Sequence, residues 1–200
     1  MKIDYKYAEI LSDILEYGYD YEDPNRKGVF RKELEIVVVK HLREDGLPIV
    51  TARKTFFKGA VGELLLFLKG STDIRDYWNY GIRFWDDDFC RFHSYTPEDL
   101  DRVYRLRNEE VSNNFYTMGK IYPHQYKKQH DVFDKFKANP LRTDLIVNSW
   151  QVDDLKDMCL IPCHYDLQLL GSTDGFMIAW NQRSTDFLLG TPINVQFYYL

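Results

Sequence analysis

The stretch "LIPCHYDLQLL", residues 160–170, decides the fold that the rest of the chain must accommodate. A proline and a cysteine lead into an alternation of apolar and polar residues, which is typical of a strand with one buried face. "STDG" (172–175) then predicts a tight hairpin turn, and "GFMIAWNQRS" (175–184) predicts the returning strand. Cys163 therefore lies where a loop enters a strand.

Three interpretations of Cys163 are open from the residues alone. A free cysteine is commonly a small, buried and inert core residue. A zinc ligand would need partners, and only Cys159 and His164 are near in sequence, with no second cysteine–histidine pair. A nucleophile would need a group that lowers its pKa. His164 points to the other face of the strand, so an arginine brought alongside is the alternative.

The composition favours one soluble domain spanning residues 1–200. The chain has 200 residues, 44% of them hydrophobic, which suffices for one buried core. The net charge of -5 argues against non-specific DNA binding. The longest apolar run, "LLLFL" (64–68), is too short for a membrane span, and the N-terminus lacks a signal-peptide core. Cys90, Cys159 and Cys163 show no paired spacing, so we expect a reducing, cytoplasmic location.

The remaining patterns mix helices with strands and predict an α+β domain without repeats or linkers. Helices are expected at 7–18, at 55–70 ending at Gly70, at 130–140, and as one short helix within 71–89. Strands are expected at 29–40, 143–150 and 165–171, and a short strand or loop at 49–54. Turns are expected at 23–28 and 43–48, and a helix with loops at 91–118.

The segment "NQRSTDFLLGTPIN", residues 181–194, carries the second group of candidate residues. Arg183 and Ser184 offer a charged fork and a hydroxyl, a combination that holds phosphate. Asp186 and Asn194 can pair with the amide edge of a heterocycle, because asparagine offers one donor and one acceptor group. A polar turn between a strand and a helix is the alternative interpretation.

Two further residues have a chemical and a structural interpretation each. Arg26, in "NRKG" (25–28), could hold a phosphate in a glycine loop or lie in a solvated turn. Glu63 stands in the apolar helix pattern "GAVGELLLFLKG" (59–70). Such a carboxylate either lies at the edge of the core or is kept there for proton transfer.

Together these segments resemble the thymidylate synthase family, in order from about residue 7 to residue 200. "PCHYDLQ" resembles the nucleophile loop of the family, and "QRSTDFLLGTPIN" resembles its phosphate, folate and pyrimidine segment. These two motifs are the most specific. The other matching segments are "DPNRKG", "GLPIVTARK", "ELLLFLKGSTDI" and "NSWQVDDLKDMCLIPCH".

The resemblance implies that Cys163 attacks C6 of the uracil of dUMP and makes C5 a carbon nucleophile. Arg183 would bind the phosphate and lower the pKa of the thiol. Glu63, Tyr122 and His164 would order waters and move protons. The substrate-binding residues implied are Arg26, Gln182, Ser184, Asp186 and Asn194, with Asn194 favouring uracil over cytosine. The folate site would be lined by Trp85, Asp186, Leu189 and Gly190.

The resemblance also implies the partners and the architecture. The carbon donor would be 5,10-methylenetetrahydrofolate, a reduced folate, and no metal is expected. The fold would be a mixed β-sheet covered by helices on one side. The other side of the sheet would pack against a second copy in a homodimer.

Several positions depart from the family pattern. The arginine pair that reaches the partner's phosphate falls on Thr143 and Asp144, and an aspartate repels phosphate. Arg142, one position earlier, is the expected replacement if the loop shifts. The second tryptophan of the folate wall falls on Asp88, and a family histidine falls on Phe56.

Two longer segments also differ from the family. Residues 91–118 look like an insertion. The family continues beyond the equivalent of Leu200 with ribose contacts and a closing tail, so a chain ending there is expected to turn over little or nothing. If the sequence is a fragment of a longer chain, this loss of turnover is not expected.

Three functions compete. A thymidylate synthase transfers a methylene and then a hydride, giving dTMP and dihydrofolate, and we favour this interpretation. A deoxyuridylate hydroxymethylase, as phages use, adds water to the methylene instead, and Asp88 favours it by admitting water. A degenerate member would bind a nucleotide or a partner without catalysis.

Overall fold

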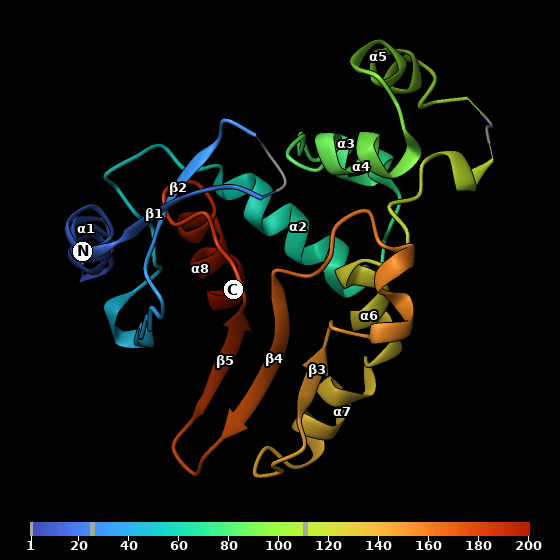
Figure 1. The fold of residues 1–200 in the computed structure, drawn as a ribbon. Helices are drawn as coiled ribbons and strands as arrows, with labels where there is room; N and C mark the ends of the chain where they lie inside the picture. Colours follow the sequence, from blue (N-terminus) through green and yellow to red (C-terminus); the bar gives the residue numbers. More distant parts are fainter. Residues whose placement is uncertain (1, 25–26, 110–111) are drawn as a thin grey trace. The chain divides into compact units, whose positions relative to one another are not determined.

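Helices and antiparallel strand pairs build the fold in the computed structural model, which describes residues 2–24, 27–109 and 112–200 (Figure 1). The α+β class expected from the sequence is confirmed. The chain divides into two compact units, Met1–Phe56 with Asp186–Tyr199 and Phe57–Thr185 with Leu200. Each unit is described by itself.

The first unit is built around an N-terminal helix. Ile3, Tyr7 and Ile10 lie on one face of this helix and are buried, which is why it begins before the predicted residue 7. Ile3 and Tyr7 pack with Val50, and the ring of Phe187 stacks on Tyr7 at 5.6 Å. The elements of this unit are α1 (Lys2–Tyr17), β1 (Tyr19–Glu22), β2 (Phe30–Glu33), η1 (Arg43–Asp45) and α8 (Thr191–Tyr199).

The strand expected at 29–40 is mostly wrong. Only Phe30–Glu33 forms a strand, paired antiparallel with Tyr19–Glu22, a strand that the sequence did not indicate. The β-branched run beyond it stays outside the hairpin, with Ile36 and Val38 84% and 76% exposed. β-propensity reflects packing against a pairing neighbour, and this segment has no such neighbour among the described residues.

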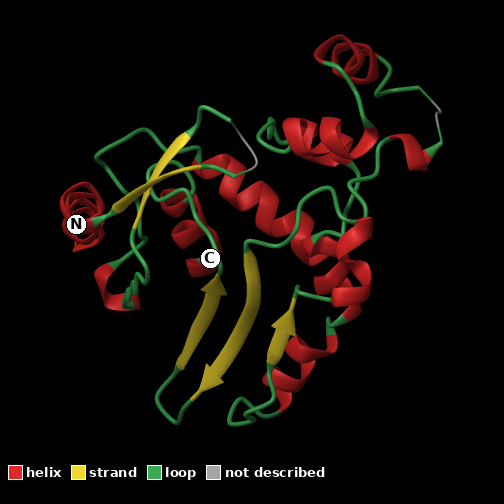
Figure 2. Cartoon of the chain, in the orientation of Figure 1, coloured by secondary structure: helices red, strands yellow, loops and turns green. Residues whose placement is uncertain are grey.

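The second unit contains a three-stranded antiparallel sheet, with the order β3-β4-β5 (yellow in Figure 2). These strands are β3 (Ile146–Asn148), β4 (His164–Gly171) and β5 (Phe176–Gln182). Leu167 and Leu169 are buried on one face, opposite Trp180 and Ile178 of the next strand. All strand pairs among the described residues are antiparallel, whereas the resemblance implied a mixed sheet.

The hairpin between β4 and β5 confirms the turn predicted at "STDG". Gly171 pairs with Phe176, and the Ser172 N–H donates to the Gly175 carbonyl at 2.8 Å. A connection of four residues can join only antiparallel neighbours, so this turn fixes the direction of β5. It also brings Gln182, at the end of β5, opposite His164 at the start of β4.

Helices cover the sheet from the side of β3. Helix α2 packs against α6, and α6 packs against β3 (Figure 1). The rings of Phe136 in α7 and Phe176 in β5 meet at 5.6 Å, so α7 also covers the sheet. The helices of this unit are α2 (Phe57–Lys69), α3 (Ile74–Asn79), α4 (Asp86–His93), α5 (Pro97–Arg105), η2 (Asn113–Phe115), α6 (Tyr122–Lys128), α7 (Asp131–Ala138) and η3 (Val152–Asp157).

The helical expectations for this unit are confirmed with small shifts. Helix α2 ends at Lys69, and Gly70 follows with a left-handed φ of 74°, as a C-terminal glycine should. The segment 91–118 contains α5, which Thr96 and Asp99 cap reciprocally. Among the described residues, every helix is too short or too polar to span a lipid bilayer.

Candidate active site

Cys163 is the last residue of the loop that enters β4, as the sequence predicted. It is half-buried, and its backbone N–H donates to the Tyr122 hydroxyl at 2.6 Å. The N–H of His164 donates to the same hydroxyl at 3.2 Å. Tyr122 begins helix α6, so one phenol oxygen joins the start of a helix to the start of a strand. The position of Cys163 therefore depends on Tyr122.

The ring of Tyr122 contacts three other aromatic rings. Its ring stacks on Phe67 at 5.1 Å and meets Trp85 edge-on at 6.1 Å and His164 at 5.6 Å. Tyr122 is 4% exposed, and burial raises the pKa of its phenol well above the ordinary value. The hydroxyl thus keeps its proton near neutral pH and can donate it while accepting two N–H groups.

Glu63 lies on the same face of α2 as Phe67, four residues before it. The carboxyl is buried, and its Oε1 accepts a hydrogen bond from the Trp85 indole Nε1 at 2.8 Å. Burial raises the pKa of Glu63 to about 7, and the Trp85 bond opposes that shift. Near neutral pH this group can therefore hold or release a proton.

A glycine makes room for this face of α2. A Cβ on Gly62 would lie 2.7 Å from the ring of Tyr80, so the close approach of the Tyr80 ring requires a residue without a side chain. Gly62 precedes Glu63 directly, and this contact fixes how α2 lies beside the turn after α3. The glutamate thus sits on a helix with little freedom to shift.

Opposing charges act on the Cys163 thiol. Burial raises its pKa above the ordinary value, and the charge of Asp88 raises it further. Arg183 and the Tyr122 hydroxyl lower the pKa, but the net shift is upward. Arg183 therefore acts in the expected direction, and burial outweighs it.

Arg183 follows β5 and holds the loop that carries Cys163. Its Nε donates to the Pro162 carbonyl at 2.9 Å and its Nη2 to the Ile161 carbonyl at 3.1 Å. Its backbone N–H donates to the Cys163 carbonyl at 2.9 Å. The side chain is also exposed, so it presents a positive charge to solvent beside the loop that carries the thiol.

His164 and Gln182 face each other across β4 and β5. Burial lowers the pKa of His164 to about 4, so its imidazole is neutral at pH 7. The buried Nε2 of Gln182 has no hydrogen-bond acceptor among the described residues. A buried donor of this kind suits a ligand oxygen.

Asp88 faces the same region from α4. Its carboxylate pairs with Arg91, and its side chain is 14% exposed. Its charge raises the pKa of both Cys163 and Cys159. A negative charge thus acts on the thiol from the position where the family resemblance placed a tryptophan.

Similarity to known protein families shows which family carries this cluster of residues. A family model described as thymidylate synthase matches residues 5–200, nearly the whole chain. The chain belongs to the thymidylate synthase family. Family membership confirms the expectation of an enzyme, a one-carbon transferase of nucleotide biosynthesis.

Individual relatives agree with the family model. The thymidylate synthase of Mesoplasma florum is 32% identical, over 98% of this chain and 72% of the relative. The probable thymidylate synthase of Escherichia phage T5 is 30% identical, over 98% of this chain and 69% of the relative. A bifunctional dihydrofolate reductase-thymidylate synthase of Zea mays is 29% identical, over 98% of this chain and 39% of the relative.

The second unit brings together most residues that the family resemblance singled out. Ser184 is half-buried, two residues beyond the end of β5. Arg26 lies outside the described residues. The residues gathered in the second unit are Glu63, Trp85, Tyr122, Cys163, His164, Gln182, Arg183 and Ser184.

The remaining expected residues belong to the first unit, around the start of α8. The Asp186 carboxylate accepts from the Leu189 N–H at 2.8 Å, and its carbonyl accepts from the Gly190 N–H at 2.8 Å. Asn194 lies half-buried in α8, and Leu189 is 53% exposed. That these residues meet Cys163 stays a prediction.

The positions that depart from the family pattern have partners of their own. Arg142 forms a bidentate ion pair with Asp144, with Nε–Oδ1 and Nη2–Oδ2 distances of 2.9 and 2.5 Å. The guanidinium offered as a replacement for the missing arginine pair is therefore engaged by a neighbouring carboxylate. Phe56, at the position of the family histidine, is 40% exposed.

Sequence reasoning did not find two contacts that shape the site. It assigned Trp85 to a folate wall, but the indole also holds the Glu63 carboxyl. It assigned Tyr122 to proton transfer, but the hydroxyl also receives the N–H groups of Cys163 and His164. Both contacts join residues more than 20 positions apart in the sequence. Residue spacing along the chain does not indicate that such residues meet.

Proposed function

We propose that this chain is a thymidylate synthase that transfers a one-carbon unit from 5,10-methylenetetrahydrofolate to C5 of dUMP. The observation that carries the proposal is the placement of Cys163. It sits at a loop–strand junction fixed by the Tyr122 hydroxyl and flanked by Arg183, within a cluster that includes a buried glutamate. A thiolate held in this way is suited to add to a conjugated double bond.

The Cys163 thiol would first lose its proton to solvent, and the thiolate sulfur would then form a bond with C6 of the uracil. The electron pair of the C5–C6 double bond moves onto C5 and is delocalised onto the O4 carbonyl. C5 then attacks the methylene carbon of the folate. Loss of the C5 proton and of the folate amine gives an exocyclic methylene, which a hydride from the folate reduces as the sulfur leaves. The products are dTMP and dihydrofolate.

The buried acid and its neighbours suit the proton transfers in this sequence. A pKa of about 7 lets Glu63 accept and return a proton at neutral pH. The Tyr122 hydroxyl accepts from the Cys163 N–H, while its ring stacks on Phe67, on the face of α2 that also carries Glu63. We assign proton movement at C5 and O4 to Glu63, Tyr122 and neutral His164, through ordered waters.

The substrate contacts are proposed from the family resemblance together with the site. Arg183, Ser184 and Arg26 would hold the phosphate, because a guanidinium and a hydroxyl suit its oxygens. Gln182 would donate its buried Nε2 to the nucleotide, and Asn194 would pair with the uracil amide edge. Trp85, Asp186, Leu189 and Gly190 would line the folate site, and the protein would act as a homodimer.

The covalent step can be tested without the folate. Addition of Cys163 to dUMP makes C5 basic, so the protein should exchange the C5 hydrogen of dUMP for deuterium in heavy water. We expect Cys163→Ser to slow this exchange by about a thousandfold or more. Cys90→Ser, a matched change of another half-buried cysteine, should leave it unchanged. Undiminished exchange by Cys163→Ser would overturn the assignment of the nucleophile.

A specific observation favours a second candidate function. The charge of the Asp88 carboxylate acts on the thiol, and the family resemblance places an aromatic wall of the folate site at this position. A carboxylate binds water and can orient it towards an exocyclic methylene. The chain would then be a deoxyuridylate hydroxymethylase, making 5-hydroxymethyl-dUMP and releasing tetrahydrofolate without oxidation.

A further inference from the structure

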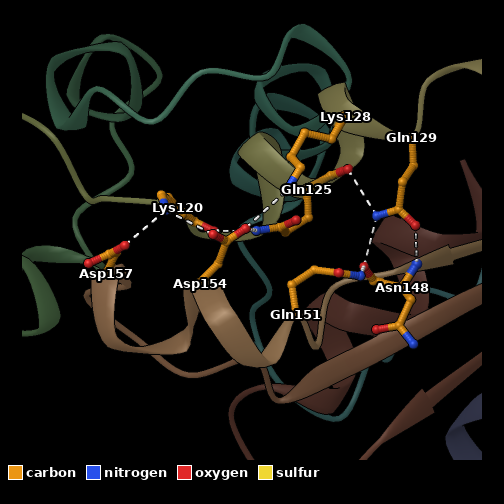
Figure 3. A network of polar contacts seen from close by, with 8 residues as sticks. All are labelled: Lys120, Gln125, Lys128, Gln129, Asn148, Gln151, Asp154 and Asp157. Carbon is orange, nitrogen blue, oxygen red and sulfur yellow. Dashed lines mark hydrogen bonds and ion pairs between the residues drawn. The ribbon is translucent and has the colours of Figure 1, made fainter.

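A buried aspartate joins both ends of helix α6 to the segment that leads to Cys163. Asp154 in η3 is 8% exposed, and Figure 3 shows three donors around its carboxylate. Lys120 donates to Oδ1 at 2.8 Å, and Gln125 and Lys128 donate to Oδ2 at 2.9 and 3.1 Å. Lys120 precedes α6, Gln125 lies inside it and Lys128 is its last residue. The Asp154 carboxylate therefore binds residues before, within and at the end of the helix.

A backbone ladder continues from this carboxylate towards the thiol. The Lys120 N–H donates to the Asp157 carbonyl at 2.8 Å, and Gly119 and Met158 form an antiparallel bridge. The Cys159 N–H then donates to the Met118 carbonyl at 3.1 Å. The segment before Tyr122 and the segment before Cys163 are therefore held side by side.

We propose that Asp154 is a positioning residue that sets the Tyr122 hydroxyl against the N–H groups of Cys163 and His164. Tyr122 is the first residue of α6, directly after the segment that Lys120 anchors. A shift of α6 relative to η3 would move this hydroxyl away from the two N–H groups that it accepts. The inference rests on the proposed function, because it concerns the geometry of the proposed nucleophile.

The charges around Asp154 fix the position of α6, beyond merely adding to the stability of the protein. Two ammonium groups and one amide converge on a single buried carboxylate, and Lys120 is shared with Asp157 at 2.9 Å. Charge-assisted bonds of this kind are stronger and more directional than neutral ones. Removing the charge would leave Lys120 and Lys128 without this partner and free α6 to shift.

A second anchor at the C-terminal end of α6, independent of Asp154, offers a control. The Gln129 amide exchanges two hydrogen bonds with the backbone of Asn148 in β3, at 2.8 and 2.9 Å (Figure 3). These bonds hold the C-terminal end of α6, away from Tyr122. Gln129→Leu should therefore destabilise the protein without acting on the nucleophile loop.

The first readout is amide hydrogen exchange of the segment 160–165, which does not depend on turnover. We expect Asp154→Asn to speed the exchange of the Cys163 and His164 amides about tenfold, because their acceptor moves. Asp153→Asn, the exposed neighbour in η3, and Gln129→Leu should leave these amides within about twofold of the native rate.

The second readout is a double-mutant cycle with Tyr122→Phe, which deletes the hydroxyl itself. We expect Asp154→Asn to lower kcat about tenfold with the KM for dUMP within about twofold. In the Tyr122→Phe background, Asp154→Asn should change kcat and amide exchange by less than about twofold. A purely structural role would add its full effect in both backgrounds.

The outcomes separate this inference from the proposed function. Unchanged exchange at Cys163 in a destabilised Asp154→Asn protein, or equal effects in both backgrounds, would overturn the positioning role. If Asp154→Asn does not fold, Asp157→Asn provides the test, because it removes only one contact of Lys120. This variant should speed the exchange of the Cys163 and His164 amides by a smaller factor. Unchanged exchange in Asp157→Asn would also overturn the positioning role. If the native protein makes no product, the proposed function fails, while the exchange measurement still decides the role of Asp154.

Discussion

At the scale of single residues, two charges of opposite sign act on the thiol of Cys163. Arg183 favours its thiolate, while Asp88 and burial favour the thiol, and the net effect is a raised pKa. Arg183 also donates to the carbonyls of Pro162 and Ile161, so the Asp88 carboxylate is the charge that a variant can remove without disturbing the loop. The reactivity of Cys163 should therefore respond to Asp88.

We expect Asp88→Asn to lower the pKa of Cys163, because it removes a negative charge that opposes ionisation. The pH dependence of alkylation by iodoacetamide should shift its midpoint to lower pH. Asp87→Asn, an exposed neighbour on the same helix, should leave the midpoint unchanged. A midpoint that moves equally in both variants would show that Asp88 acts only through the net charge of the helix.

Glu63 predicts a pH-dependent stability. Its folded pKa of about 7 exceeds the ordinary value of 4.5, so between these values the folded state holds a proton that the unfolded state releases. This contribution is complete below pH 4.5 and is lost as the pH rises to about 7. Relative to the wild type, Glu63→Gln should gain up to roughly 3 kcal/mol in the free energy of unfolding across that range.

Urea unfolding of both proteins at several pH values measures this difference. The comparison isolates Glu63, because His164, whose pKa of about 4 is below its ordinary value, affects both proteins alike. A difference that stays constant from pH 4.5 to pH 7 would show that the glutamate is solvated in the folded protein.

At the scale of elements, a glycine allows the two segments that lead to Tyr122 and Cys163 to approach. Gly119 has a left-handed φ of 75°, and a Cβ there would lie 1.9 Å from the Asp157 carbonyl oxygen. We expect Gly119→Ala to cost about 3 kcal/mol or more in stability, since backbone must move. Gly28→Ala, at a left-handed φ of 80° with open space around it, should cost about 1 kcal/mol.

Thermal or urea unfolding of the two alanine variants checks this expectation. The difference between them measures the close backbone approach, because only at Gly119 does the added Cβ meet a neighbouring backbone. Equal losses of stability would mean that the segments 118–120 and 157–159 separate without cost. The native contact would then not constrain the loop that carries Cys163.

The elements that the sequence predicted well are those fixed by local chemistry. The β4–β5 hairpin follows from a short polar turn between alternating strands, and α2 follows from helical periodicity ending at Gly70. The strand expected at 29–40 failed because β-branched residues favour a strand only where a neighbour pairs with them. The sequence cannot supply that neighbour by itself.

At the scale of the whole molecule, the sheet leaves one face with apolar side chains exposed. Met177, opposite Leu170, is 53% exposed, and Ile146 of β3 is 42% exposed. The homodimer expected from the family resemblance would cover such a face. We expect sedimentation equilibrium to show a dimer, and Met177→Asp to weaken its association by about tenfold or more.

A change outside the sheet controls for the added charge. Asn79→Asp, at an exposed position in α3, adds the same charge and leaves the sheet unchanged. A native protein that sediments as a monomer, or a dimer insensitive to Met177→Asp, would contradict a sheet-to-sheet interface. The active-site proposals for Cys163 and Glu63 would then have to hold within one copy.

From the sequence, only those residues of the candidate site that belong to a family motif could be predicted. Cys163 and Arg183 were found in this way, and the structure places them together because β4 and β5 are neighbours. The bonds from Trp85 to Glu63 and from Cys163 to Tyr122 cross between distant segments. Only packing brings these groups into contact, so their roles as supports emerged from the structure.

The most direct test of the central claim is the nucleotide product formed from dUMP and 5,10-methylenetetrahydrofolate. The account predicts that the nucleotide gains the mass of one methylene group, with dihydrofolate appearing in equal amount, and that Cys163→Ser abolishes both. A gain of a hydroxymethyl group without dihydrofolate would instead support the hydroxymethylase and a water held by Asp88. An unchanged nucleotide from folded protein at saturating substrates would contradict both enzymatic functions.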